Sequence, residues 1–234
     1  MSNYLKILLI IITLFVSSCS NNSDNAYNQN ELNVHNKFPT DKYSHLYNSL
    51  YISIALKKSL EDEALSAFIE NIQTMDDIKL FEKISRISKN SYRFDYSEII
   101  ADRWIDISNE SYQAYMFGLS ASIDNNNLNK AKYYFNNFLR VANPINKSDY
   151  AELIFFIMDN KNRINVVNFF EDYLEKNENY DLHLNFIELL YTYNLHEKVI
   201  NHIDDIGTYN DRSIVRIFAN SHSSVEHYIP AASI

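Results

Sequence analysis

The sequence predicts an all-α protein built from antiparallel helical hairpins, and three observations lead to this prediction. The chain of 234 residues contains only 2 glycines and 3 prolines, too few for the tight turns of a β-rich or doubly wound fold. Apolar residues recur at helical spacing on both sides of a polar turn in residues 112–144. A short signature from the second half of that stretch then recurs along the chain.

The hairpin in residues 112–144 has the clearest pattern. Its first helix places four small or apolar residues on one stripe, and these are Ala114, Phe117, Gly118 and Ala121. Its second helix does the same with Leu128, Ala131, Phe135, Phe138 and Leu139. Asn127, the last residue of the polar turn, is expected to cap the second helix. Gly118 and Ala131 are expected to face each other, and Pro144 ends the unit because its ring cannot continue a helix.

The signature is a small or branched residue followed three or four positions later by an aromatic or aliphatic residue. It begins at Ala64, Ala101, Ala131, Val167 and Val199, which are 37, 30, 36 and 32 residues apart. The hairpin resembles the tetratricopeptide repeat (TPR), whose period is roughly 34 residues. The residues that carry this resemblance are Tyr115 or Ala114, Phe117, Gly118, Ala121, Ala131, Phe135 and Pro144. The resemblance implies stacked hairpins forming a degenerate α-solenoid, and the alternative is an irregular all-α domain without repeats.

The predicted helical domain covers residues 41–234. Its first hairpin spans residues 41–75, and the inner stripe of the first helix is expected to consist of Tyr43, Tyr47, Leu50 and Ile54, with Leu46 as a further candidate. Asp76 and Asp77 are expected to start the next helix. Residues 90–95 are expected to form a long turn, and the single tryptophan, Trp104, is expected in the core of the following helix.

Three further units follow Pro144. A helix is expected over residues 148–159, where Asp149 and Glu152 have capping-box spacing, with a partner helix that contains Ile164, Val167, Phe170 and Leu174. A last full hairpin is expected from about residue 183 to residue 203, and Gly207 is expected to end it in a left-handed turn. One more helix is expected from Asp211, in the position of a solenoid cap.

The N-terminal residues predict export. Lys6 precedes an apolar run over residues 7–16, which as a helix would rise about 15 Å, half of the hydrocarbon thickness of a bilayer. Residues 1–18 are therefore expected to be a signal peptide. Val16-Ser17-Ser18-Cys19 resembles the lipobox of bacterial lipoproteins, which implies that Cys19 carries lipid, palmitate included. By the same resemblance, the serine after Cys19 implies an outer-membrane anchor facing the periplasm.

Two expectations accompany this assignment. Residues 19–40 are expected to be the lipidated cysteine and a flexible polar tether, because they are rich in asparagine and have no apolar periodicity. The alternative for the N-terminus is an ordinary secretory signal with a chance cysteine.

The sequence offers no recognisable catalytic or metal-binding motif. Two glycines cannot form a phosphate-binding loop, and no nucleophile elbow is present. His196-Glu197 begins like the helix of a zinc protease, but the second histidine is missing at the required spacing. The formal charge of −9 disfavours nucleic acid. We therefore expect no enzyme activity, no catalytic residue, no metal and no cofactor.

The function expected from the sequence is protein binding. The TPR resemblance implies that the first helix of each hairpin lines an inner groove, and the residues that it places there are Tyr115, Leu119, Glu152, Phe156, Asp159, Leu184, Glu188 and Tyr191. This mixture of aromatic rings and carboxylates suits a segment of another envelope protein with basic and apolar side chains. The alternatives are an accessory or regulatory subunit of a cell-wall hydrolase or other envelope enzyme, and a helical carbohydrate-processing enzyme.

Overall fold

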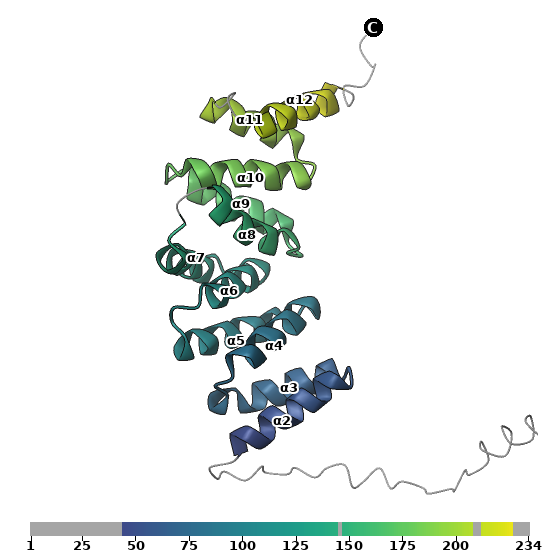
Figure 1. The fold of residues 1–234 in the computed structure, drawn as a ribbon. Helices are drawn as coiled ribbons and strands as arrows, with labels where there is room; N and C mark the ends of the chain where they lie inside the picture. Colours follow the sequence, from purple (N-terminus) through teal and green to yellow (C-terminus); the bar gives the residue numbers. More distant parts are fainter. Residues whose placement is uncertain (1–43, 145–146, 208–211, 227–234) are drawn as a thin grey trace, which may run out of the picture. The chain divides into compact units, whose positions relative to one another are not determined.

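The computed structural model describes residues 44–144, 147–207 and 212–226. These ranges contain eleven α-helices, one short 3-10 helix and no strand (Figure 1). The helices are α2 (Ser44–Lys57), α3 (Glu61–Asn71), α4 (Ile78–Asn90), α5 (Phe94–Ile107), α6 (Tyr112–Asp124), α7 (Leu128–Ala142), α8 (Lys147–Met158), α9 (Arg163–Leu174), α10 (Tyr180–Thr192), α11 (His196–Ile206) and α12 (Arg212–Glu226). The 3-10 helix, η2 (Ile72–Thr74), follows α3. The all-α prediction is confirmed, whereas residues 1–18, Cys19 and the rest of the predicted tether lie outside the described residues.

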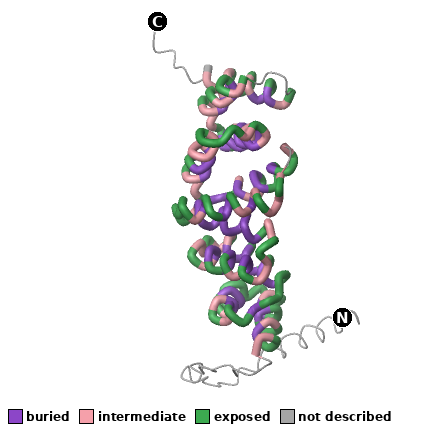
Figure 2. Tube along the Cα trace, turned by 90° about the vertical axis from the view of Figure 1, so that its left-hand side faces the viewer, coloured by how far each residue is buried: buried purple, intermediate pink, exposed green. Residues whose placement is uncertain are grey.

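The helices pack mainly against their neighbours along the chain, as in a solenoid. α2 packs on α3, α4 on α5, α6 on α7 and α10 on α11. The first helices of successive pairs also form a row, in which α4, α6, α8, α10 and α12 each contact the next. Figure 2 shows the buried residues on the sides where helices face one another. No helix in the described ranges is long and apolar enough to span a bilayer.

Residues next to the helix ends cap several of the helices. Asp77 caps α4 by accepting from the backbone N–H groups of Lys79 and Leu80, and Asn127 caps α7 by accepting from that of Lys130. At the C-terminal ends, Asn143 after α7 and Gly207 after α11 adopt left-handed conformations, with φ of 46° and 62°. The positions of Asp77, Asn127 and Gly207 confirm the helix boundaries predicted from these residues.

The recurring signature marks the second helix of each pair. Ala64, Ala101, Ala131, Val167 and Val199 lie in α3, α5, α7, α9 and α11 respectively, and all five are buried. Trp104 is also buried, as predicted. A small or branched residue at this position of the second helix allows the neighbouring helix to pack closely. The signature therefore marks an equivalent packing position in each pair.

Gly118 allows α6 and α7 to approach closely, but not in the way the sequence predicted. A Cβ atom at Gly118 would lie 2.6 Å from the ring of Tyr134, so the partner of Gly118 is this ring and not Ala131. Tyr134 is fully buried, and its hydroxyl donates to Asp102 of α5 at 2.5 Å. The missing side chain at Gly118 therefore makes room for an aromatic ring that connects α7 to α5.

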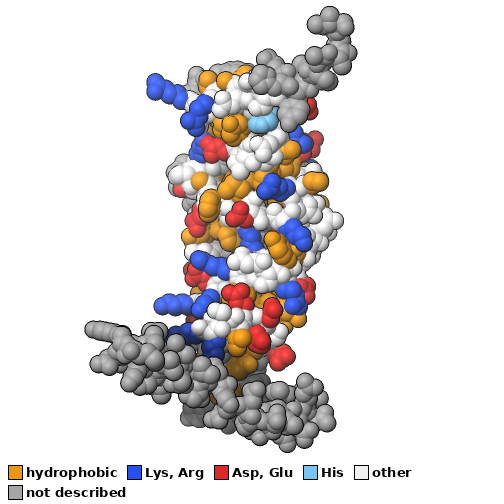
Figure 3. Space-filling model, turned by 90° about the vertical axis from the view of Figure 1, so that its right-hand side faces the viewer, with side chains coloured by type: hydrophobic (Ala, Val, Ile, Leu, Met, Phe, Trp, Pro, Cys, Tyr) orange, Lys and Arg blue, Asp and Glu red, His pale blue; other side chains and the backbone are white. Residues whose placement is uncertain are grey.

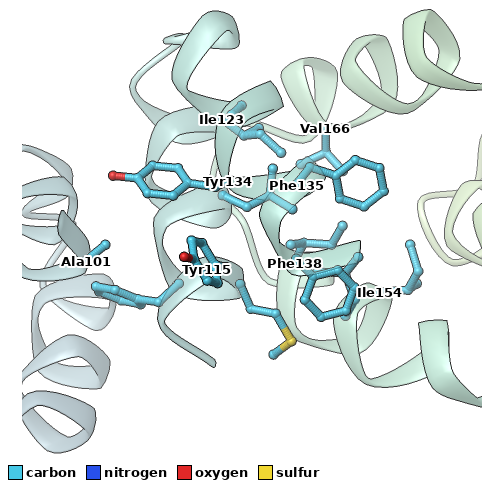
Figure 4. Close-up of a cluster of buried hydrophobic side chains, with 14 of the residues drawn as sticks. Ala101, Tyr115, Ile123, Tyr134, Phe135, Phe138, Ile154 and Val166 are labelled. Atoms are coloured by element: carbon cyan, nitrogen blue, oxygen red, sulfur yellow. The ribbon is translucent and has the colours of Figure 1, made fainter. Parts of the chain in front are cut away.

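Aromatic side chains fill the interfaces beyond α7. Phe135 lies 4.7–5.7 Å, centroid to centroid, from three rings of α9, namely Phe169, Phe170 and Tyr173. Figure 4 shows Phe135 and Phe138 on the side of α7 that faces Val166 and Ile154. Beyond α7 the pairing of helices becomes irregular, because α8 packs chiefly on α10, and α9 contacts α6 and α10.

A buried polar contact attaches the turn after α8 to α6. Ser120 Oγ donates to Asn160 Oδ1 at 2.5 Å, and Asn160 Nδ2 donates to the backbone oxygen of Ser120 at 3.0 Å. Both side chains are buried, so each satisfies the other where water has no access. This contact fixes the position of α8 relative to α6.

The predicted face of α2 was wrong. Leu46, Tyr47, Leu50 and Ile54 are 45–60% exposed, and the buried residues of α2 are Asn48, Ile52 and Ala55. Apolar residues lie on nearly every side of α2, so their periodicity could not show which face is buried. The buried face is the one that packs on α3.

Two smaller predictions also need correction. The turn between α4 and α5 comprises only Ser91–Arg93, because both helices extend into the segment predicted as a long turn. Leu128 and Ile164, which the sequence placed on the packing stripes of their helices, are exposed. Both lie in the first turn of a helix.

Candidate partner-binding surface

The eight residues predicted to line a groove divide into two groups. Tyr115, Leu119 and Leu184 are at most 4% exposed, so their side chains belong to the core and do not face solvent. The other five reach the surface: Glu152 and Asp159 are exposed, and Phe156, Glu188 and Tyr191 are partly buried. Their role in binding stays a prediction. Four of these five lie at two pockets on the row of first helices.

The larger pocket, here called the α4/α8 pocket, has a volume of about 670 Å³. It is lined by Arg86, Lys89, Asn90 and Tyr92 from the end of α4 and the following turn, and by Phe155, Phe156 and Asp159 from the end of α8. Only Phe156 and Asp159 were expected from the sequence. The other residues were missed because nothing local connects α4 to a helix that begins 57 residues after α4 ends.

Lys89 connects the two walls of the α4/α8 pocket. Its Nζ donates to the backbone oxygen of Phe156 at 2.5 Å and lies 3.9 Å from the centre of the Phe156 ring. Phe156 is in the last turn of α8, where backbone oxygens lack partners within the helix and carry partial negative charge. Burial lowers the pKa of Lys89 to about 8, although the carboxylates of Asp124 and Asp159 oppose this shift. Lys89 is therefore a partly desolvated cation held against the end of α8.

Two exposed rings give this pocket an apolar component. Phe155 is 69% exposed and Tyr92 is 59% exposed, and Lys161 Nζ lies 4.7 Å from the centre of the Tyr92 ring. Arg86, also exposed, bonds Glu82 at 2.7 Å on the same helix. The lining thus combines two cations, one carboxylate and accessible aromatic rings. Such a surface can hold an apolar side chain and an adjacent acidic group.

The second pocket, here called the α10/α12 pocket, has a volume of about 470 Å³. Glu188, Tyr191 and Thr192 of α10 line one side, and Ser213, Arg216, Ile217 and Asn220 of α12 line the other. Glu188 pairs with Lys147 at 2.7 Å, and Asn220 donates to the Tyr191 hydroxyl at 3.3 Å. This pocket also mixes an aromatic ring with charges of both signs.

No group of three or more histidine, cysteine or acidic side chains in the described ranges is arranged to hold a metal ion. Lysine, arginine and acidic side chains are interspersed with hydrophobic ones on the face in Figure 3, without a large area of one charge.

A histidine pair lies outside both pockets. His183 Nε2 and His202 Nδ1 are 2.8 Å apart, so one ring donates to the other, and His202 Nε2 lies 3.6 Å from Glu171. Burial, followed by the neighbouring His202, lowers the pKa of His183 to about 4, with Asp205 acting in the opposite direction. The unprotonated His183 is therefore the form that the fold accommodates.

This pKa gives a pH dependence of stability. An unfolded histidine binds its proton near pH 6.5 and the folded His183 only near pH 4, so the stability present above 6.5 is lost as the pH falls between these values. Over this pH range we expect the free energy of unfolding to fall by about 1–2 kcal/mol. The value is smaller than the pKa shift alone would give, because His183 is partly exposed to solvent. Urea unfolding at several pH values, compared with a His183→Gln variant, measures it. Identical pH profiles for the two proteins would contradict the assignment.

No family model matches the chain, and no match was found among curated proteins.

Proposed function

We propose that the protein is a non-enzymatic, lipid-anchored, TPR-like scaffold that binds a segment of another envelope protein along its first helices. The observation that supports this proposal most directly is the α4/α8 pocket, where two strongly exposed aromatic rings stand beside Lys89 and Arg86. Exposed rings next to charged groups are typical of protein-binding sites, because the rings give buried area and the charges give orientation.

The two pockets suggest how a segment would be recognised. The sequence suggested a segment with basic and apolar side chains, but at the α4/α8 pocket Arg86 and Lys89 favour an acidic group instead. An apolar side chain beside that group would enter between Tyr92 and Phe155. At the α10/α12 pocket, Tyr191 offers a ring, and Arg216 and Glu188 offer charges of both signs. Because successive first helices contact one another from α4 to α12, one extended or helical segment can run along them.

Site-specific photocrosslinking in intact cells tests this proposal. A photoreactive phenylalanine analogue replaces Phe155 in one strain and Tyr191 in a second. We expect both positions to form a crosslink to the same envelope protein, identified by mass spectrometry. The matched control is Ile164, which is 72% exposed but lies on α9, a second helix. Equal crosslinking from Ile164, or none from Phe155 and Tyr191, would contradict a binding surface on the first helices.

The lipid anchor is tested separately in the same strains. Cys19 is the only cysteine, so a Cys19→Ala chain should incorporate no labelled palmitate and should leave the membrane fraction. Equal membrane retention of this variant would refute the anchor. It would leave the crosslinking result, and hence the binding surface, unaffected.

A further inference from the structure

Lys89 of α4 differs from other lysines of the chain in what it contacts. Lys130 and Lys198, for example, each hold a carboxylate oxygen within 3.1 Å of their Nζ atoms. The Nζ atom of Lys89 instead donates to the backbone oxygen of Phe156 and lies over the Phe156 ring. A partly buried lysine with these neighbours loses water without gaining a carboxylate in exchange.

The charged groups around Lys89 come from three elements. Asp124 at the end of α6 and Asp159 in the turn after α8 act on Lys89 through their charge, and neither bonds it directly. The other charged groups at the pocket are Arg86 with its partner Glu82 on α4, and Lys161 beside Tyr92. Burial outweighs the two carboxylates, and the pKa of Lys89 is therefore lowered to about 8. Near pH 7.5, roughly one Lys89 side chain in four is an uncharged amine, against roughly one in a thousand for an ordinary lysine.

This amine lies beside rings that are open to solvent. Phe155 and Tyr92 are 69% and 59% exposed, and both line the α4/α8 pocket together with Lys89. A lysine that burial leaves uncharged in an apolar pocket is a nucleophile towards carbonyl carbon atoms. The pocket therefore combines a reactive amine with a place for an aromatic ring.

We infer that Lys89 is a covalent binding site for a neutral aromatic aldehyde, which its amine captures as an imine in the α4/α8 pocket. Nζ attacks the carbonyl carbon, a C=N bond forms, and the carbonyl oxygen leaves as water with the two amine hydrogens. The ring of the aldehyde packs against Phe155 and Tyr92. With the amine uncharged, the charged side chains that line the pocket are Arg86 and Asp159, one of each sign, so a neutral ligand fits this lining.

The contacts that hold the free amine also suit the imine. When it is protonated, the imine keeps one N–H group, which can still donate to the backbone oxygen of Phe156. Asp124 and Asp159, which favour a positive charge on Lys89, favour the protonated imine in the same way. The site therefore offers a partner for both the charge and the N–H group of the adduct.

Reductive trapping on the purified full-length protein tests this inference. Benzaldehyde is added with sodium cyanoborohydride, which reduces the imine to a stable amine, and mass spectrometry of the peptides gives the rate at each lysine. At about pH 7.5, Lys89 should be trapped at least about 10-fold faster than Lys161, an exposed lysine beside the same pocket. This ratio should fall as the pH rises from roughly 8 to roughly 10, where ordinary lysines also lose their proton. Equal rates at the lower pH, or a ratio that does not change with pH, would overturn the inference.

The preference for a ring is tested with Phe155→Ala. Relative to Lys161, Lys89 of the wild type should be trapped faster by benzaldehyde than by acetaldehyde, and the variant should lose about 3–10-fold of this preference with the ring contact. Phe155 is largely exposed, so unchanged circular dichroism should show that the variant is folded.

The control is Ile164→Ala, at an exposed site on α9, which should keep the preference. No preference in the wild type, or an unchanged one in Phe155→Ala, would overturn the aromatic class of ligand. Because the probe is a small molecule, neither result depends on the protein segment proposed above.

Discussion

Phe135→Ala is expected to reduce the free energy of unfolding by about 4 kcal/mol, the largest loss that we expect from a single change. Phe135 is fully buried in α7, and its ring contacts Phe169, Phe170 and Tyr173 of α9. Removing it leaves a cavity bounded by other rings, which cannot collapse without moving a helix. Thermal unfolding should show a fall in Tm of roughly 10 °C.

The control for this prediction is Phe155→Ala. It removes the same atoms from a ring that is 69% exposed and should change stability by less than about 0.5 kcal/mol. A Phe135→Ala loss close to that of Phe155→Ala would show that the aromatic interface between α7 and α9 does not hold these helices together.

Gly118→Ala is expected to destabilise the protein by about 2–3 kcal/mol, although helix propensity alone predicts a gain of about 1 kcal/mol. The added methyl group would lie 2.6 Å from the Tyr134 ring, which is fully buried and cannot move without losing the contact of its hydroxyl with Asp102. A lower free energy of unfolding would therefore show that the clash with Tyr134 outweighs the higher helix propensity of alanine. Urea unfolding at neutral pH measures it.

Gly207→Ala provides the matched control. Gly207 has a φ of 62°, and nothing lies within 4 Å of a Cβ atom there, so the substitution should cost only the backbone strain, about 1 kcal/mol. If Gly118→Ala proved as stable as the wild type, close packing between α6 and Tyr134 would not be the reason for glycine at this position.

The sequence predicted the features that depend on local chemistry. Asp77 and Asn127 cap helices, and Gly207 ends α11, because each acts on backbone groups a few residues away. Ala131 and the equivalent positions of the other pairs were found because one helix turn fixes the spacing of its packing residues. These features establish the number and order of most helices.

Features that depend on distant residues could not be predicted in the same way. Lys89 meets Phe156, 67 residues later, and no spacing rule connects the two. The partner of Gly118 was mistaken because a small residue can receive either another small residue or a large ring, and only the packed structure shows Tyr134 there. On α2, apolar residues lie on nearly every side, so the sequence could not show which face packs on α3. For the same reason, the sequence did not show that Tyr115, Leu119 and Leu184 are buried and do not line a surface.

The burial of α6 affects what happens when the chain is cut between α6 and α7. Its ten residues from Ala114 to Ile123 are covered by helices on both sides, from α5 before it and from α7 after it. Proteolytic nicking at the turn Asn125–Asn127, or expression of two fragments that meet there, would separate α6 from α7 and uncover an apolar surface on both pieces. We therefore expect both pieces to aggregate when they are separated.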